Sequence, residues 1–188
     1  MIYSKKVEQL LINAFTGESL ARNRYSFFAK VADKEGHKEI RDVFLETAEN
    51  EHEHAKLFYN LIPEGKHKTE SCYPYFIGST IDNLKFSADG ERDEWENIYR
   101  YSSDVAKEEG YNDVAALFNH IIEVEKHHDY RYRKIYEDLI DDKFYKKDTQ
   151  TQWLCKKCGF IIIGKEAPAK CPCCKHDRGY YKQFCEKY

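Results

Sequence analysis

The sequence lacks any long hydrophobic run, and its longest apolar stretches, such as residues 160–163, span only a few residues. A membrane helix needs about 20 consecutive apolar residues, so we expect no membrane association. The chain also has no large block of one charge, and its net charge is −3 over 188 residues, which argues against nucleic acid as a partner. Its first residues lead directly into a helical pattern, so we expect no signal peptide and a cytoplasmic location.

Proline is scarce too. Only four prolines occur, and the long segments between them are free to be helical because proline is the residue that most disrupts a helix interior. In four such segments, apolar residues recur at the i, i+3, i+4, i+7 spacing of an amphipathic helix. These segments are residues 7–32, 40–61, 84–105 and 114–139.

The connections between these segments indicate the topology. Gly36 and Gly110 follow the first and third segments and predict short turns, whereas residues 63–79 form a long connection. Two helix hairpins joined by one long connection predict a mainly α fold, a ferritin-like four-helix bundle with one long crossover.

The two predicted hairpins also resemble each other in sequence. Residues 34–44 match residues 108–118 at an offset of 74, whereas residues 17–18 match residues 90–91 at an offset of 73. An internal repeat of this kind indicates two similar units. We therefore expect the hairpins to pack about a pseudo-twofold axis, on which side chains at equivalent positions converge.

Seven acidic or imidazole residues fall on the apolar stripes of these helices. A single one would be explained as a hydrogen-bonded core residue, but several ionised carboxylates in one core repel each other and are costly to bury. One Glu from each of two helices, with Glu-x-x-His from each of the other two, is the di-iron carboxylate pattern, and these donors suit iron or manganese better than copper. The predicted ligands of a dinuclear metal site are Glu18, Glu51, His54, Glu91, Glu94, Glu125 and His128.

Three of the residues in and near this pattern need separate treatment. Glu94 has no acidic counterpart, because Ala21 occupies the matching position in the first hairpin. It is interpreted either as a ligand that one metal exchanges for an imidazole, or as a carboxylate hydrogen-bonded to a ligand. His52 and His127 lie off the stripes, and we expect them to face solvent.

Cysteine is nearly absent from the first 150 residues, which hold one of the seven, while the remaining six lie in the last 38. This shift predicts a domain boundary, with residues 1–147 forming the bundle, residues 148–188 forming a second domain, and the polar residues 146–152 acting as a linker. A tail this short is not stable on its own core and needs a metal or disulfides.

Two Cys-x-x-Cys pairs, separated by 12 residues, predict a tetrathiolate metal knuckle formed by Cys155, Cys158, Cys171 and Cys174. Disulfides are the alternative, but nothing in the sequence indicates export. The spacing does not separate zinc from iron. A rubredoxin-type iron centre is favoured by the neighbouring residues Gly159, Pro172, Trp153, Phe160, Tyr180 and Tyr181. Cys173 lies between two of these ligands and could compete with them, but it is interpreted as a bystander, and we expect free thiols at Cys72 and Cys185.

Taken together, these motifs resemble the rubrerythrin family over nearly the whole chain. The stretches that carry the resemblance are residues 14–25, 49–56, 90–95, 123–128, 153–159, 164–168 and 171–174. The resemblance implies a non-haem di-iron peroxidase that reduces hydrogen peroxide to water in oxidative-stress defence. It also implies that electrons come from an NAD(P)H-dependent reductase or rubredoxin and pass through the rubredoxin-type iron.

The resemblance further implies individual roles for the seven site residues. Glu18 with His54 or Glu94 would serve one iron, Glu91 with His128 the other, and Glu51 and Glu125 would bridge them. In the family, one iron moves between the two alternative ligands when the redox state changes. We expect Tyr25 or Tyr99 to manage protons.

The sequence leaves alternatives open for the oligomeric state and for the activity of the protein. His128 lies about 20 Å from the end of the fourth helix, at 1.5 Å per residue, so a tail attached there is far from its own metal pair, and a head-to-tail homodimer would shorten the path. The alternatives to a peroxidase are a ferroxidase that handles iron and a redox electron carrier. The rubredoxin-like tail argues against iron storage, which needs no such donor.

Overall fold

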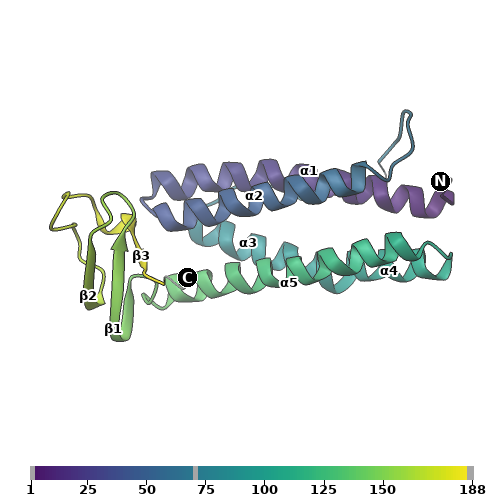
Figure 1. Ribbon diagram of the computed structural model, residues 1–188. Helices are drawn as coiled ribbons and strands as arrows, with labels where there is room; N and C mark the ends of the chain where they lie inside the picture. The colour runs from purple at the N-terminus through teal and green to yellow at the C-terminus, as the bar shows by residue number, and fades with distance from the viewer. Residues whose placement is uncertain (1–2, 70–71, 186–188) are drawn as a thin grey trace.

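The structure is a computed structural model that describes residues 3–69 and 72–185. Two long hairpins run alongside each other, and a small strand-containing domain lies at one end (Figure 1). The helical elements are α1 (Lys5–Lys34), α2 (Lys38–Tyr59), α3 (Thr80–Asp93), the π-helix η1 (Glu94–Ile98), α4 (Tyr99–Glu108) and α5 (Asn112–Ile140). The α3–η1–α4 segment is one continuous rod, so the predicted bundle of four helices with a long crossover is confirmed.

The helix ends follow from local side chains and from glycine. The Ser4 hydroxyl accepts a hydrogen bond from the Val7 amide at 3.2 Å and caps α1, and Ser79 begins α3 in a reciprocal capping box. Gly36 and Gly110 have φ values of 89° and 85°, a left-handed conformation that glycine adopts without a steric penalty. Both predicted hairpin turns are therefore confirmed.

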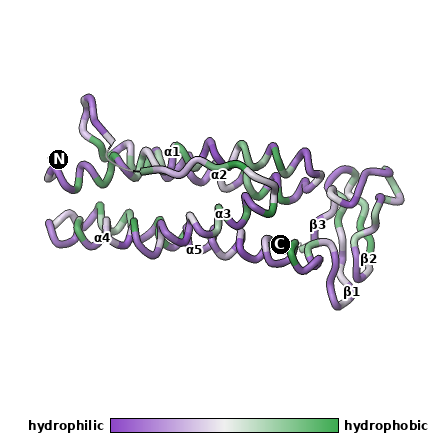
Figure 2. Tube along the Cα trace, turned by 180° about the vertical axis from the view of Figure 1, so that it is seen from behind, coloured by the Kyte–Doolittle hydropathy of each residue, from purple (hydrophilic) through white to green (hydrophobic). Residues whose placement is uncertain are grey.

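Apolar packing occupies both ends of the bundle and leaves a polar layer between them. Figure 2 shows hydrophobic and hydrophilic residues alternating along the helices, as the stripes predict. One buried cluster, nearer the N-terminus, includes Leu11, Phe58 and Phe118, and the other includes Phe28 and Phe44. The buried Glu and His residues lie between these two clusters along the sequence of each helix, where apolar side chains limit the access of water.

The π-helix accounts for the change in repeat offset. In η1 the Tyr99 amide donates to the Glu94 carbonyl, five residues earlier, rather than four as in an α-helix. Glu18 matches Glu91 at an offset of 73, whereas Tyr25 matches Tyr99 at 74. The second hairpin therefore has one extra residue between Glu91 and Tyr99, and the wider π turn accommodates it.

The tail is a small antiparallel sheet with its own core. Its strands β1 (Lys146–Cys155), β2 (Ile161–Glu166) and β3 (Tyr181–Gln183) are ordered β2-β1-β3, and the short 3-10 helix η2 (Arg178–Tyr180) precedes β3. The prediction that residues 146–152 form a linker is wrong, because they are the first part of β1 and Thr151 pairs with Gly164. Across the described residues, no helix combines the length and apolar character needed to cross a membrane.

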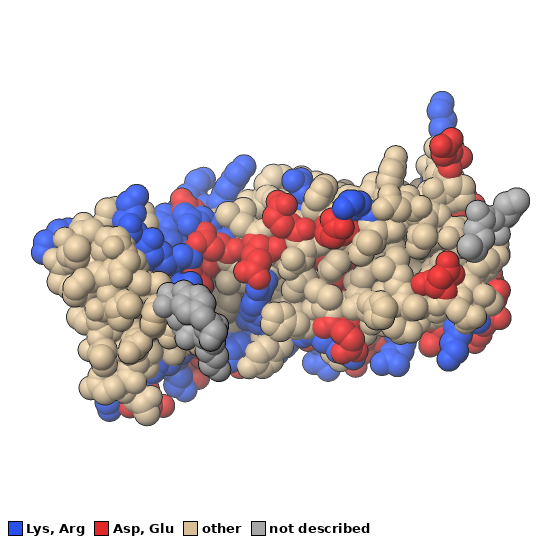
Figure 3. Space-filling model, viewed as in Figure 1, with Lys and Arg blue, Asp and Glu red and all other residues tan. Residues whose placement is uncertain are grey.

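The tail contacts the turn between α1 and α2. The Lys156 ammonium contacts the carboxylates of Glu39 and Asp42 on α2, and Figure 3 shows basic and acidic side chains next to each other where the tail meets the helices. Gly179 lies so close to the turn that a Cβ there would stand 1.5 Å from the Gly36 carbonyl oxygen. This backbone contact and the ion pairs fix the tail against the bundle.

Candidate metal centres

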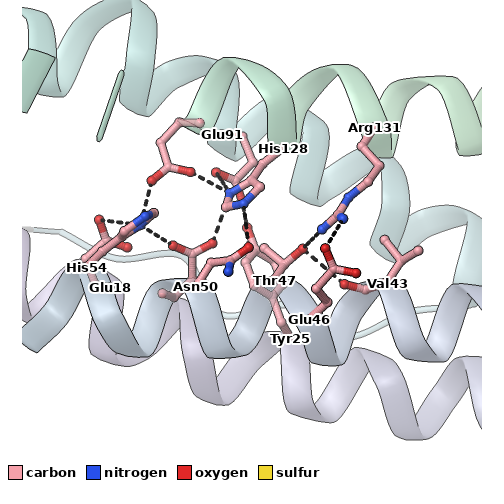
Figure 4. Close-up of polar contacts among 12 residues, drawn as sticks. Glu18, Tyr25, Val43, Glu46, Thr47, Asn50, His54, Glu91, His128 and Arg131 are labelled. Atoms are coloured by element: carbon pink, nitrogen blue, oxygen red, sulfur yellow. Dashed lines mark hydrogen bonds and ion pairs between the residues drawn. The ribbon is translucent and has the colours of Figure 1, made fainter. Parts of the chain in front are cut away.

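Six of the seven predicted bundle ligands converge in the polar layer. They come from both hairpins, with one Glu each from α1 and α3 and a Glu-x-x-His pair each from α2 and α5. Figure 4 shows several of them pointing toward one another between the helices. Their potential ligand atoms lie within 4.8 Å of one another in two clusters, Glu18–Glu51–His54–Glu125 and Glu51–Glu91–Glu125–His128.

The first cluster surrounds the His54 ring. His54 Nδ1 lies 2.8 Å from Glu51 Oε2 and 2.9 Å from Glu125 Oε1. Glu18 Oε1 is 3.9 Å away. All four residues are buried. The Nδ1 nitrogen therefore faces three carboxylates, an arrangement in which a neutral imidazole can donate its lone pair to a cation.

The second cluster repeats this arrangement around His128. His128 Nδ1 lies 2.6 Å from Glu125 Oε2, 3.3 Å from Glu51 Oε1 and 3.7 Å from Glu91 Oε2. Glu51 and Glu125 face both imidazoles, whereas Glu18 and Glu91 each face one. This geometry matches a pair of metal positions with two shared carboxylates.

The electrostatics of the two clusters fit bound cations. Burial, and next repulsion from Glu51 and Glu125, raises the pKa of Glu18 well above its usual range. Burial would also raise the pKa of Glu51, but hydrogen bonds with His128 and His54 outweigh it and lower that pKa to about 2. Protein groups alone therefore do not stabilise every carboxylate in its ionised form.

Unpaired oxygens point to the same conclusion. In each of four carboxylates, one buried oxygen either has no polar neighbour within hydrogen-bond geometry among the described residues or faces only an imidazole Nδ1, which has no proton to donate when it is free to bind a cation. These oxygens are Glu18 Oε2, Glu51 Oε1, Glu91 Oε2 and Glu125 Oε1. Buried oxygens without partners are costly. Two cations, one in each cluster, would satisfy these oxygens, so the residues present fit a dinuclear centre.

Two buried tyrosines connect the hairpins beside the clusters. The Tyr25 hydroxyl donates to Glu91 Oε1, and the Tyr99 hydroxyl donates to Glu18 Oε1 at 2.5 Å. The two contacts are equivalent in the repeat, because Glu18 matches Glu91 and Tyr25 matches Tyr99. Burial, followed by the adjacent carboxylate, raises the pKa of both phenols well above 10.0, so they remain protonated.

Glu94 is the one predicted ligand outside both clusters. It begins η1 and is partly exposed to a cavity beside the site. Burial, and then repulsion from Glu91 and Glu51, raises its pKa well above the usual value. The structure therefore shows His54 within the first cluster and Glu94 apart from it, and an exchange between them stays a prediction.

Asn50 is a residue that the sequence analysis did not identify. Its Oδ1 lies 3.2 Å from His128 Nε2, as Figure 4 shows, so the imidazole donates a proton there and presents Nδ1 to the carboxylates. The matching position in the other hairpin is Val124, which has no such acceptor. The difference between Asn50 and Val124 at matching positions of the repeat is the sequence feature that could have identified Asn50. The off-stripe His52 and His127 are exposed, as predicted.

The four predicted cysteine ligands converge in the tail. Sγ of Cys155 lies 3.7 Å from Sγ of Cys174, and Sγ of Cys158 lies 3.7 Å from Sγ of Cys171. A disulfide requires about 2.05 Å, whereas four sulfurs about 2.3 Å from a tetrahedral metal lie about 3.8 Å apart. The geometry therefore fits a tetrathiolate metal and excludes disulfides here.

The thiols outside the knuckle also match the prediction. Cys72, Cys173 and Cys185 are free and exposed. In the knuckle, burial raises the pKa of Cys171, but hydrogen bonds from the Cys174 amide and other donors outweigh it and lower that pKa to about 6. The lowered pKa favours the thiolate form of Cys171, which is the form that binds a metal.

Comparison with known proteins agrees with both sites. A family model described as Rubrerythrin matches residues 9–136, and a second, described as Rubrerythrin, rubredoxin-like domain, matches residues 153–182. A putative rubrerythrin of Methanocaldococcus jannaschii is 42% identical, over 100% of this chain and 97% of its own length. A rubrerythrin of Porphyromonas gingivalis is 40% identical, over 100% and 94%.

Solved structures show the same architecture. A structure described as the fully reduced, all-ferrous state of nigerythrin aligns with a TM-score of 0.64 and 29% identity, covering 98% of this chain and 89% of that one. A Mycobacterium tuberculosis bacterioferritin aligns at 0.66 with 20% identity, covering 76% and 90%, which shows the shared bundle fold. The two carboxylate–histidine clusters and the four-cysteine knuckle match rubrerythrin iron centres, and the chain belongs to the rubrerythrin family of iron oxidoreductases.

Proposed function

We propose that this protein is a peroxidase that reduces hydrogen peroxide to water in oxidative-stress defence. The observation that carries the proposal is the presence on one chain of two carboxylate–histidine clusters with shared carboxylates and a four-cysteine cluster, each able to hold a metal ion. A paired centre suits a two-electron reaction, and the knuckle suits the delivery of electrons one at a time. Family membership supports both halves of this assignment.

We assign all seven predicted bundle residues to the catalytic iron pair and four cysteines to the second centre. When bound, the reduced iron pair supplies the two electrons that break the O–O bond. This assignment is supported by the contacts of the imidazoles, because Glu18 and Glu91 each face one of them while Glu51 and Glu125 face both. The proposed metal ligands are Glu18, Glu51, His54, Glu91, Glu94, Glu125, His128, Cys155, Cys158, Cys171 and Cys174.

The chain's own residues hold the protons that the reaction needs. Reduction of peroxide to two waters consumes two protons, and each phenol of Tyr25 and Tyr99 holds one against a carboxylate oxygen. Glu94 lines the cavity beside these phenols, and its carboxylate is assigned to the metal pair rather than to proton supply.

Electron delivery is the reason to propose a head-to-tail homodimer. Lys156 of the knuckle contacts Asp42, and Asp42 precedes Glu51 by nine residues of α2, or about 14 Å along the helix axis. The cysteines lie beyond that contact, so the path within one chain is longer still. A second copy could bring its knuckle nearer to the carboxylate clusters.

The remaining parts of the proposal concern organisation and partners. We propose that residues 1–147 and 148–188 are the two domains, and that an NAD(P)H-dependent reductase or rubredoxin supplies the electrons. A cytoplasmic location is supported by seven cysteines, all of them described by the structure, of which none is in a disulfide, since disulfides form mainly in oxidising compartments.

The test combines metal content with turnover. Protein purified without air should hold about three irons per chain, and it should consume hydrogen peroxide with NAD(P)H, a reductase and rubredoxin. Elution as a dimer on gel filtration supports the enzyme, whereas a cage-sized assembly that mineralises iron supports the ferroxidase alternative. Three bound irons without peroxide turnover would leave an electron carrier and refute the peroxidase.

A further inference from the structure

A cavity of about 610 Å³ lies beside the carboxylate clusters. It runs between α1 and the α3–η1–α4 rod, and residues 72–74 of the crossover line one side. The volume is large for the substrate proposed above, since a water molecule takes about 30 Å³ in the liquid and hydrogen peroxide has only one more heavy atom. The cavity is instead within the range of about 300–1,000 Å³ found for organic ligands.

The reactive groups lie at one part of this cavity. Tyr25, Tyr99 and Glu94 all line it. The first two are the phenols that donate to Glu91 and Glu18, the carboxylates of the two clusters. A molecule held in the cavity therefore has hydroxyl donors and the proposed iron pair beside it, while the rest of the molecule extends away from the site.

The walls of the cavity favour an apolar molecule. Leu10, Phe86, Ile98 and Tyr101 present hydrophobic or aromatic surface to it, and burial of apolar surface is favourable by roughly 25 cal/mol per Å². Hydrogen peroxide has no apolar surface and would gain nothing from these side chains. An organic group attached to the peroxide would gain from them.

The charged residues in the lining disfavour an anion. Among the described lining residues, Asp89, Asp93 and Glu94 are acidic and Arg24 is basic. The Arg24 guanidinium is stacked over the Phe86 ring, 5.5 Å from its centroid. Asp89 pairs with Lys85 and Arg133, so the lining has no excess of positive charge that would attract a carboxylate-bearing hydroperoxide. A neutral molecule therefore fits best.

We propose that this cavity binds neutral organic hydroperoxides and presents their O–O bond to the carboxylate clusters. The inference rests on the proposed peroxidase function and adds a substrate class to it. The hydroperoxide takes up two electrons and two protons, its O–O bond breaks, and one alcohol and one water form. The two electrons come from the reduced iron pair and are replaced by the same reductant as for hydrogen peroxide.

Gly90 provides a way to fill the cavity without displacing the backbone. It lies on α3 and lines the cavity, and outside its own helix turn and chain neighbours no described atom lies within 4 Å of the position that a Cβ would occupy. Its φ is outside the left-handed region, so a side chain is not strained there. Gly90→Phe places a ring in the space proposed for the organic group, and Gly90→Ala is the matched control that leaves most of that space open.

The experiment compares cumene hydroperoxide with hydrogen peroxide in the reductant-coupled assay, using the iron-loaded full chain. We expect the wild type and Gly90→Ala to reduce both. Gly90→Phe should lose at least tenfold in kcat/KM for cumene hydroperoxide and change less than twofold for hydrogen peroxide. Leu10→Trp, which enlarges a side chain of the opposite wall on α1, eight residues before Glu18, should act in the same direction.

A binding measurement gives a readout that does not depend on turnover. Calorimetric titration of the oxidised full chain with 2-phenyl-2-propanol, the alcohol product, should detect binding that Gly90→Phe weakens at least tenfold. Undetectable binding overturns the inference, as does equal loss of both activities in Gly90→Phe. Reduction of hydrogen peroxide alone by the wild type overturns the substrate class and leaves the proposed function intact, whereas reduction of neither peroxide refutes both.

Discussion

Asn50 should act as a positioning residue for one metal of the pair. Its Oδ1 accepts from His128 Nε2 at 3.2 Å, which fixes the ring so that Nδ1 faces Glu125 at 2.6 Å. In Asn50→Ala the ring loses this acceptor and can rotate or change tautomer. We expect the metal on the His128 side to bind more weakly as a result.

The expected size follows from the geometry of this contact. Removing such an outer hydrogen bond commonly costs 10–100-fold in metal affinity, or about 1.4–2.8 kcal/mol. The 3.2 Å separation is at the long end for an N–H···O hydrogen bond. We therefore expect the lower value, about tenfold. The position that matches Asn50 beside His54 is Val124, which offers no side-chain acceptor, so the other metal should change less than twofold.

The assay is an anaerobic chelator competition that resolves the two Fe(II) affinities of the bundle. Val124→Ala, at the position that matches Asn50 in the repeat, is the control and should leave both affinities within twofold. Asn50→Asp retains an acceptor and should recover most of the loss. Equal weakening of both metals in Asn50→Ala, or no weakening of either, would show that the contact does not position His128.

Three further predictions test the remaining parts of the site and the tail. Glu94→Ala leaves six cluster residues, so two metals should still bind, while the reduction potential of the iron pair rises and its reactivity with peroxide falls. Crystal structures of the wild type in two redox states test the ligand exchange, and unchanged distances from iron to Glu94 and His54 would contradict it. A chain that ends at Lys147 should keep the metal pair and lose reductase-coupled turnover, because it lacks the knuckle; unchanged steady-state activity would show that the tail is not the donor. Burial raises the pKa of Asp42, but hydrogen bonds from Arg41 and Lys156 outweigh it and hold that pKa below 3.8. The ionised Asp42 carboxylate therefore stabilises the fold above pH 3.8, and this stabilisation is lost as the pH falls through the lowered pKa. The difference in Tm between wild type and Asp42→Asn should narrow between pH 5 and 3. A constant difference would contradict the ion pair.

Much of the architecture was predictable because its signals are local in sequence. Helical stripes depend on a period of 3.6 residues, and Glu-x-x-His puts Glu51 and His54 on one helix face for the same reason. The two Cys-x-x-Cys pairs likewise indicate a metal knuckle from spacing alone. Such patterns form the same element wherever the chain buries the stripe, so the sequence alone predicts both the bundle and the knuckle.

Contacts between segments that lie far apart in the sequence were not predictable in this way. The polar composition of residues 146–152 indicated a linker, but pairing with β2 makes them a strand. Strand pairing depends on a partner elsewhere in the chain, and packing routinely overrides local preference. The ion pairs of Lys156 with Glu39 and Asp42 also join residues more than a hundred positions apart.

The sequence by itself determined which residues could bind metal, while the tertiary structure decided how each of them is held. The shift in repeat offset from 73 to 74 was visible in the sequence, but only the backbone shows that a π turn takes up the extra residue and leaves Glu94 beside a cavity instead of in a cluster. Asn50 reaches His128 only because α2 and α5 pack side by side. Spacing along one helix determines on which face of that helix a side chain lies. Contacts between helices depend instead on interhelical distances, which the packing of the whole chain sets.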